Sequence, residues 1–226
     1  MSEVASQGQP IVDLIVKERV VAIVRGLLPD QSMRVAATLV DAGIRALEVT
    51  YRSNQPGDVT ENAAVIGRLR AEFGDRLAVG AGTVTTLGQL DAAAAAGAQF
   101  IVSPNTDAAV IAATRQKGLA SLPGAMTPSE AVAAYSAGAN FVKLFPAEQL
   151  GPDYLKAIRA PLADIPFLVV GGIRADNVRS FLDAGAVGAG VGGKMVSRAL
   201  ADAGEYDQMA DAAKAILAAV NGVDGQ

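Results

Sequence analysis

The sequence predicts a single α/β domain, a (β/α)8 TIM barrel with an N-terminal helix. Short runs rich in Val and Ile recur along the 226 residues, and each is followed by an Ala-rich amphipathic stretch, as in parallel βα units. About eight such units can be counted, which is the number that closes a barrel. The core is aliphatic, because 51% of the residues are hydrophobic and only 4% are aromatic, a composition typical of buried parallel strands.

The elements are expected in a simple alternating order within one domain covering residues 1–226. A helix at about 11–19 precedes the first strand, which begins at about residue 20, and this helix could plug the bottom of the barrel. A C-terminal helix is expected at about 203–220. Strands are expected near 20–25, 46–51, 77–81, 100–103, 119–122, 141–145, 167–170 and 187–191.

A weak internal repeat agrees with this count. Four segments with a common Ala-Gly pair, at 41–44, 95–98, 136–139 and 183–186, each stand just before an expected strand. Glycine past a helix end adopts the left-handed conformation that stops the helix, so the repeat concerns the fold and not the function. An open, doubly wound sheet is the alternative fold. It would need a Gly-x-Gly-x-x-Gly fingerprint in the first βα turn, where only Gly26 is found.

The composition excludes several function classes. The chain contains no His and no Cys, which rules out disulfides, His/Cys zinc sites, Ser-His-Asp triads and Cys-His dyads. No metal site is expected, although a carboxylate-only magnesium or manganese site stays open. The net charge is −4 without a basic stripe, so no nucleic-acid partner is expected. No membrane span or targeting leader is seen, and the cytoplasm is the expected location.

Lys143 is the most informative residue, because it places an ammonium in the middle of an expected strand, 141–145. Both faces of a barrel strand are buried, so Lys143 is desolvated whichever way it points. Desolvation lowers the pKa of a lysine and favours the neutral amine that can attack a ketone. The alternative is a lysine held in an ion network or reaching the surface.

Glu48 interrupts the second expected strand in the same way. Strand periodicity puts Glu48, Thr50 and Arg52 on one face, where they would line the lumen. With Glu48 on the second strand and Lys143 on the sixth, the two side chains can share a layer across the barrel. The alternative is a salt bridge that merely compensates Lys143 and raises its pKa.

Glycine pairs follow the last two expected strands. Gly171 and Gly172 follow the seventh strand, while Gly192 and Gly193, followed by Lys194, come after the eighth. Loops at these places, with backbone N–H groups and helix N-termini, form the usual phosphate site of a barrel. A further run, Gly80 to Thr83, ends the third strand and would let a ligand approach the backbone, with the Thr83 hydroxyl as a donor.

These segments resemble the 2-keto-3-deoxy-6-phosphogluconate / 4-hydroxy-2-oxoglutarate aldolase family of class I enzymes. The resemblance runs over nearly the whole chain and rests on residues 21–26, 47–52, 79–84, 102–105, 122–124 and 141–146. It implies a Schiff base on Lys143, a general acid/base at Glu48, no cofactor and a trimeric assembly. It further implies that Arg52 and Thr83 hold the carboxylate of a keto acid, Pro104 and Phe145 form an apolar wall, and Arg25 lies near a distal anion.

The implied reaction is cleavage of a 2-keto-3-deoxy-6-phospho-sugar acid into pyruvate and glyceraldehyde 3-phosphate. Two positions depart from the phosphogluconate members, which usually carry Thr and Ser where this chain has Val170 and Lys194. Val170 and the segment 151–157 look more like the phosphogalactonate branch, yet that branch commonly lacks an arginine at the position of Arg52. Alternatives are an aldolase for 4-hydroxy-2-oxoglutarate or another non-phosphorylated substrate, a metal-free isomerase or synthase, and a non-catalytic sugar-phosphate-binding barrel.

Overall fold

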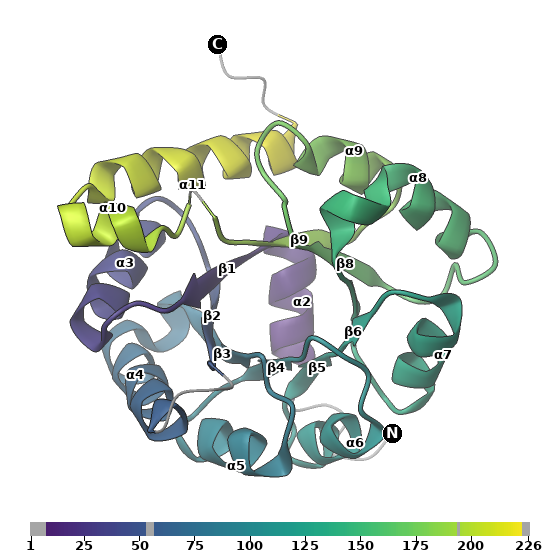
Figure 1. Cartoon of the computed structure of the whole chain (residues 1–226), viewed down its shortest axis with the longest axis horizontal. Helices are drawn as coiled ribbons and strands as arrows, with labels where there is room; N and C mark the ends of the chain where they lie inside the picture. Colours follow the sequence, from purple (N-terminus) through teal and green to yellow (C-terminus); the bar gives the residue numbers. More distant parts are fainter. Residues whose placement is uncertain (1–7, 53–56, 194, 223–226) are drawn as a thin grey trace.

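The computed structural model describes residues 8–52, 57–193 and 195–222. Its parallel strands form a barrel surrounded by helices (Figure 1), as the sequence predicts. The strand neighbours follow the order β5-β4-β3-β2-β1-β9-β8-β7-β6. The strands are β1 (Val20–Arg25), β2 (Ala46–Thr50), β3 (Ala78–Gly82), β4 (Phe100–Val102), β5 (Ala120–Leu122), β6 (Gly124–Ala125), β7 (Val142–Leu144), β8 (Phe167–Val170) and β9 (Gly188–Val191).

The fifth predicted strand is divided in two by Pro123. Proline has no backbone N–H to donate, which interrupts the strand ladder at that residue. The first part, β5, pairs with β4, and the second part, β6, pairs with β7. Because β5 and β6 are consecutive in the chain, the ring of strands closes through Pro123. The nine described strands therefore correspond to the eight that the sequence predicts.

Helices connect the strands and form the outer layer of the barrel (Figure 1). The helices are α2 (Gln9–Glu18), α3 (Pro29–Asp41), α4 (Asp58–Phe73), α5 (Leu87–Ala95), α6 (Ala108–Gln116), α7 (Pro128–Ser136), α8 (Ala147–Arg159), α9 (Val178–Asp183), α10 (Arg198–Ala203) and α11 (Tyr206–Asn221), with a short 3-10 turn, η1 (Gly74–Arg76). Four of them, α5, α6, α7 and α10, begin at the capping residues Thr86, Asp107, Thr127 and Ser197, whose side chains accept hydrogen bonds from the first turn. None of the helices described is long and apolar enough to cross a membrane.

Two separate cores result from the alternation of side chains along each strand. In β2, Leu47 and Val49 belong to the outer core between the sheet and the helices, whereas Ala46 belongs to the core of the lumen. Helix α2 lies across the barrel in Figure 1, and its buried Ile15 packs into the lumen core. The predicted N-terminal helix is thus present and closes one end of the barrel. The open end carries the site described next.

Candidate active site

Lys143 points into the lumen from the middle of β7. Its neighbours Val142 and Leu144 face the outer core, so alternation turns Lys143 inward, where it is 6% exposed. Its Nζ lies 4.9 Å from the centroid of the Phe145 ring. Burial lowers the pKa of Lys143, Glu48 acts in the opposite direction to a smaller extent, and Arg25 lowers it further. The environment therefore favours the neutral, nucleophilic amine.

Glu48 enters the same lumen from β2 and is 3% exposed. Its Oε1 accepts a hydrogen bond of 3.2 Å from the Thr50 hydroxyl. Burial raises the pKa of Glu48, and this outweighs the lowering by Lys143, by the Thr50 hydroxyl and by Arg25. Each side chain of the pair is thus held toward its uncharged form, which a compensating salt bridge would not do. Thr50, which strand periodicity places beside Glu48, is part of the site.

Two glycines of β3 make room for these lumen side chains. A Cβ on Gly82 would overlap the Glu48 carboxylate, and a Cβ on Gly80 would overlap the ring of Phe100. The approach of a ligand to the backbone of the run from Gly80 to Thr83 stays a prediction, and the structure gives the two glycines a further role. The protein's own side chains occupy that space, and Gly82 fixes where Glu48 can lie.

Thr83 and Pro104 lie at the carboxyl ends of β3 and β4, as barrel site residues do. Thr83 has a φ of 59°, a left-handed conformation that is strained for a β-branched residue and that clusters at functional sites. The carbonyl of Pro104 lies directly against Gly124, and Gly124 is the register partner of Lys143. Pro104 is thereby placed one strand away from the lysine.

Arg52 lies just past β2 and is held by helix α4. Its Nε donates to Asp58 at 2.6 Å and its Nη2 to Glu61 at 3.1 Å. The buried Asp58 also accepts the backbone N–H of Arg52 at 2.6 Å. Periodicity predicts that Arg52 lines the lumen with Glu48 and Thr50. The structure holds its guanidinium against these two carboxylates in the first turn of α4, and the position of Arg52 in the lumen stays a prediction.

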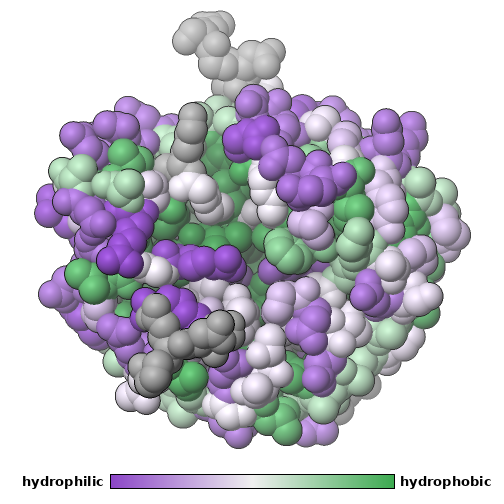
Figure 2. Space-filling view, in the orientation of Figure 1, coloured by the Kyte–Doolittle hydropathy of each residue, from purple (hydrophilic) through white to green (hydrophobic). Residues whose placement is uncertain are grey.

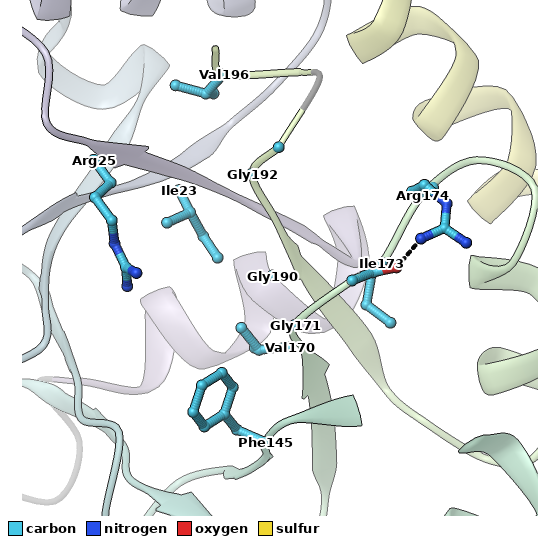
Figure 3. A pocket seen from close by; sticks show the side chains of 12 residues that line it. Ile23, Arg25, Phe145, Val170, Gly171, Ile173, Arg174, Gly190, Gly192 and Val196 are labelled. Carbon is cyan, nitrogen blue, oxygen red and sulfur yellow. Dashed lines mark hydrogen bonds between the residues drawn. The ribbon is translucent and has the colours of Figure 1, made fainter. Parts of the chain in front are cut away.

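A cavity of about 500 Å³ opens beside Phe145 at the same end of the barrel. Figure 2 shows a hollow with a hydrophobic floor in the middle of this face, and Figure 3 shows side chains that line the cavity. The lining residues are Ile23, Arg25, Phe145, Val170, Gly171, Gly172, Ile173, Arg174, Gly190, Gly192, Gly193 and Val196. The structure thus brings together Arg25, Phe145, Val170 and both glycine pairs, all of which the sequence singles out.

The two glycine turns differ from the expectation in one respect. Gly171 and Gly172 have φ values of 99° and 74°, conformations that glycine adopts without strain. Neither pair leads directly into a helix, because α9 begins at Val178 and α10 at Arg198. Backbone groups and side chains of the turns, rather than helix N-termini, therefore border the cavity. Lys194 lies outside the described residues.

Sequence reasoning missed Arg174 and Glu148. Arg174 lines the cavity and donates from Nη1 to Glu148 at 2.6 Å. The available signal was the position of Arg174, two residues after Gly172. Glu148 lies 23 residues earlier than Gly171 in the sequence, so no local pattern connects it to the turn. No group of three or more His, Cys, Asp or Glu side chains suited to a metal ion occurs among the described residues.

Together the fold and the site define the chain as a (β/α)8-barrel enzyme with a desolvated lysine and a buried carboxyl in its lumen. The family model described as KDPG and KHG aldolase matches residues 11–212. The chain belongs to this family of aldolases, which are lyases, and the resemblance stated above is confirmed.

Individual relatives agree with this assignment. The chain is 38% identical over 173 residues to the 2-dehydro-3-deoxy-6-phosphogalactonate aldolase of Escherichia coli K12, covering 76% of this chain and 82% of the relative. It is 34% identical to a solved structure described as native KDPGal, with a TM-score of 0.81 and coverage of 90% and 95%. A KDPG aldolase from Legionella pneumophila, 26% identical with a TM-score of 0.81 over 91% and 97% of the chains, was solved with pyruvate as a covalent carbinolamine intermediate.

Proposed function

We propose that this chain is a class I aldolase that cleaves a 2-keto-3-deoxy-6-phospho-sugar acid, of the phosphogluconate or phosphogalactonate type, into pyruvate and glyceraldehyde 3-phosphate. The observation that carries the proposal is Lys143, a buried lysine whose pKa is lowered by burial. Its Nζ lies near the ring of Phe145, which lines the cavity. The cycle is covalent catalysis by an amine and needs no cofactor.

In the first half of the cycle, the neutral Nζ of Lys143 attacks the C2 ketone and forms a carbinolamine. The protonated carboxyl of Glu48 donates a proton to the departing hydroxyl, and loss of water leaves an iminium ion. The raised pKa of Glu48 supports this step, because it keeps the carboxyl protonated where an ordinary glutamate is ionised.

In the second half, the carboxylate of Glu48 takes the proton from the C4 hydroxyl, directly or through one water. The C3–C4 bond breaks, the aldehyde leaves, and the bonding electrons move into the iminium to give the enamine of pyruvate. Glu48 returns the proton to C3, and water then hydrolyses the new iminium to release pyruvate and regenerate Lys143. Proton shuttling of this kind is typically worth about 10² to 10⁴ in rate.

The keto acid is held beside Lys143 by residues just past the carboxyl ends of β2, β3, β4 and β7. Arg52 and Thr83 bind its carboxylate, and Pro104 with Phe145 forms the apolar wall of the pyruvyl pocket. The Nε and Nη2 bonds to Asp58 and Glu61 fix the plane of the Arg52 guanidinium. A guanidinium fixed in this way is pre-organised for a carboxylate.

The hydroxylated tail and its phosphate occupy the cavity next to Phe145. Val170 lines this cavity as an apolar group, and the turns at Gly171–Gly172 and Gly192–Gly193, with Lys194, border the phosphate. A second candidate substrate is 4-hydroxy-2-oxoglutarate or another non-phosphorylated keto acid. It is favoured by Arg25, which lines the cavity near the lumen, because an arginine pairs as well with a carboxylate as with a phosphate.

Reductive trapping tests the proposal. Pyruvate with borohydride should add one reduced adduct to Lys143, located by mass spectrometry of the peptides. Lys143→Met should remove the adduct and serves as the control. An unmodified parent protein would overturn the Schiff-base mechanism. Pyruvate release, coupled to lactate dehydrogenase, should then be compared for both phosphorylated epimers and for 4-hydroxy-2-oxoglutarate, which identifies the substrate.

The same measurements separate the remaining alternatives. A non-catalytic sugar-phosphate-binding barrel would be stabilised by substrate without releasing pyruvate, and the presence of Lys143, Glu48 and Arg52 together argues against it. We further propose that the chain acts in the cytoplasm as a homotrimer. Exposed apolar side chains on and next to α7, namely Met126, Val132 and Tyr135, support the proposal of a contact with a second copy.

A further inference from the structure

The Gly171–Gly172 turn carries a negative charge as well as a positive one. The side chain of Glu148 lies against Gly172, in the place that a Cβ would take. Its backbone N–H also donates to the carbonyl of Gly171 at 3.0 Å. The carboxylate is therefore tied to the turn that borders the cavity. A dianion at this turn is repelled by Glu148 unless a cation compensates for it.

Arg174 supplies that cation. Its Nη1 donates to Glu148 at 2.6 Å and to the carbonyl of Gly172 at 3.0 Å, and its Nε donates to Asp176 at 3.2 Å. These bonds use the Nε and Nη1 groups of the guanidinium. The Nη2 group has no hydrogen-bond partner among the described residues, so two N–H donors remain on a side chain that lines the cavity.

Arg174 also complements Arg25. Figure 3 shows the two arginines on opposite sides of the cavity, with Val170 and Phe145 between them. Arg25 is close enough to the lumen to lower the pKa values of Lys143 and Glu48. Arg174 affects neither of these pKa values. The two cations are thus divided between the reacting end and the distal end of the cavity.

We infer that Arg174 is a specificity-determining residue, which neutralises Glu148 and binds the phosphate monoester of the substrate tail through Nη2. The inference rests on the proposed function and deepens it. Because Arg174 neutralises the carboxylate that borders the site, the site can accept a dianion. A substrate that lacks the phosphate makes no use of it.

The test compares the parent with Arg174→Ala on a phosphorylated and a non-phosphorylated substrate. The KM for the phosphorylated keto acid should rise roughly 10- to 100-fold, the size expected for losing a charge-assisted hydrogen bond. The KM for 4-hydroxy-2-oxoglutarate should change by less than about twofold. The matched control is Arg179→Ala, which removes an exposed arginine paired with Asp183 at 2.9 Å on α9, away from the cavity lining.

A double variant separates neutralisation from direct binding. Glu148→Gln alone should lower the KM for the phosphorylated substrate, because it removes the repelling charge. In the Arg174→Ala background it should recover part of the loss, and the part that remains measures the Nη2 contacts. Equal losses on both substrates, or an unchanged KM in Arg174→Ala, would overturn the inference.

Binding of inorganic phosphate provides a readout that does not depend on catalysis. Phosphate should raise the melting temperature of the parent and of Arg179→Ala more than that of Arg174→Ala. An identical shift in all three proteins would contradict a role for Arg174. Failure of the proposed function has a different signature, since the parent would then form no pyruvate adduct and release no pyruvate from either substrate.

Discussion

Lys143 and Glu48 enter one lumen from opposite parts of the sheet, β7 and β2, and each affects the pKa of the other. No direct ion pair between these two residues is found among the described side chains. For both groups, burial has a larger effect on the pKa than the attraction of the partner. A lysine and a glutamate whose main role was mutual compensation would show the opposite balance. The arrangement instead favours a neutral base and a neutral acid in the same lumen, which is what carbinolamine formation and dehydration require.

Removing the acid should separate adduct formation from turnover. In Glu48→Gln, Lys143 can still attack pyruvate, so borohydride trapping should continue. The kcat for cleavage should fall about 10²- to 10⁴-fold, because proton transfer at the C4 hydroxyl and at C3 loses its catalyst. Near-normal turnover in this variant would reduce Glu48 to a structural role. Glu72→Gln, which changes an exposed carboxylate on α4 away from the cavity lining, is the control.

The pH dependence of kcat/KM should follow the two shifted groups. At low pH, protonation of Lys143 removes the nucleophile, so activity falls as the pH drops through its lowered pKa. At high pH, activity falls as Glu48 loses its proton, at a pH above the ordinary range of a glutamate. The acidic and basic limbs of this pH profile report the titration of the coupled pair and not of either residue alone. In Glu48→Gln, the fall of kcat/KM at high pH should disappear. Activity that appears only near the ordinary lysine value of 10.5 would contradict the lowered pKa of Lys143.

Gly82 should be essential for catalysis, because only a residue without a side chain leaves room for the Glu48 carboxylate. In Gly82→Ala the new Cβ displaces the Glu48 carboxylate, and a misplacement of about 1 Å costs roughly 10²-fold in kcat. Trapping of pyruvate on Lys143 should persist. Gly67→Ala is the matched control, since its Cβ meets no atom closer than 3.8 Å inside α4. It should raise the free energy of unfolding by about 0.4–1 kcal/mol. Unchanged turnover in Gly82→Ala would show that Glu48 can work from another position.

The assembly can be tested at the apolar surface of α7. Light scattering during size exclusion should give three times the chain mass of 22.9 kDa. Tyr135→Glu should shift the protein toward the monomer, because it places a charge in the proposed contact. Val16→Asp changes an equally exposed apolar residue on α2 and should leave the mass unchanged. A parent that is monomeric at micromolar concentration would refute the trimer.

Much of the fold follows from the sequence through periodicity. Val142 and Leu144 flank Lys143, and Leu47 and Val49 flank Glu48, in runs typical of strands that are buried on both faces, so the burial of both charged residues follows from the sequence. The order of the strands follows from the repeated βα pattern. The division of the fifth strand at Pro123 is visible in the sequence only as a proline, and the pairing of its two halves with different neighbours is a property of the closed sheet.

The candidate site divides in the same way between local and long-range information. Lys143, Glu48 and the glycine pairs are recognisable from the sequence. Each of the two charged residues interrupts an apolar strand, and each glycine pair follows directly after a strand. The pairing of Arg52 with Asp58 and Glu61 was not expected, because it depends on how α4 returns across the end of β2.

By itself the sequence determined the barrel, the buried position of Lys143 on its strand and the family. Only the tertiary structure decided which contacts surround them: that Glu48 fills the space above Gly82, and that Glu148 and Arg174 meet at the Gly171–Gly172 turn. The physical reason is that periodicity and composition report on one element at a time. Desolvation, repulsion and neutralisation depend on which elements the closed sheet brings within a few ångströms of each other.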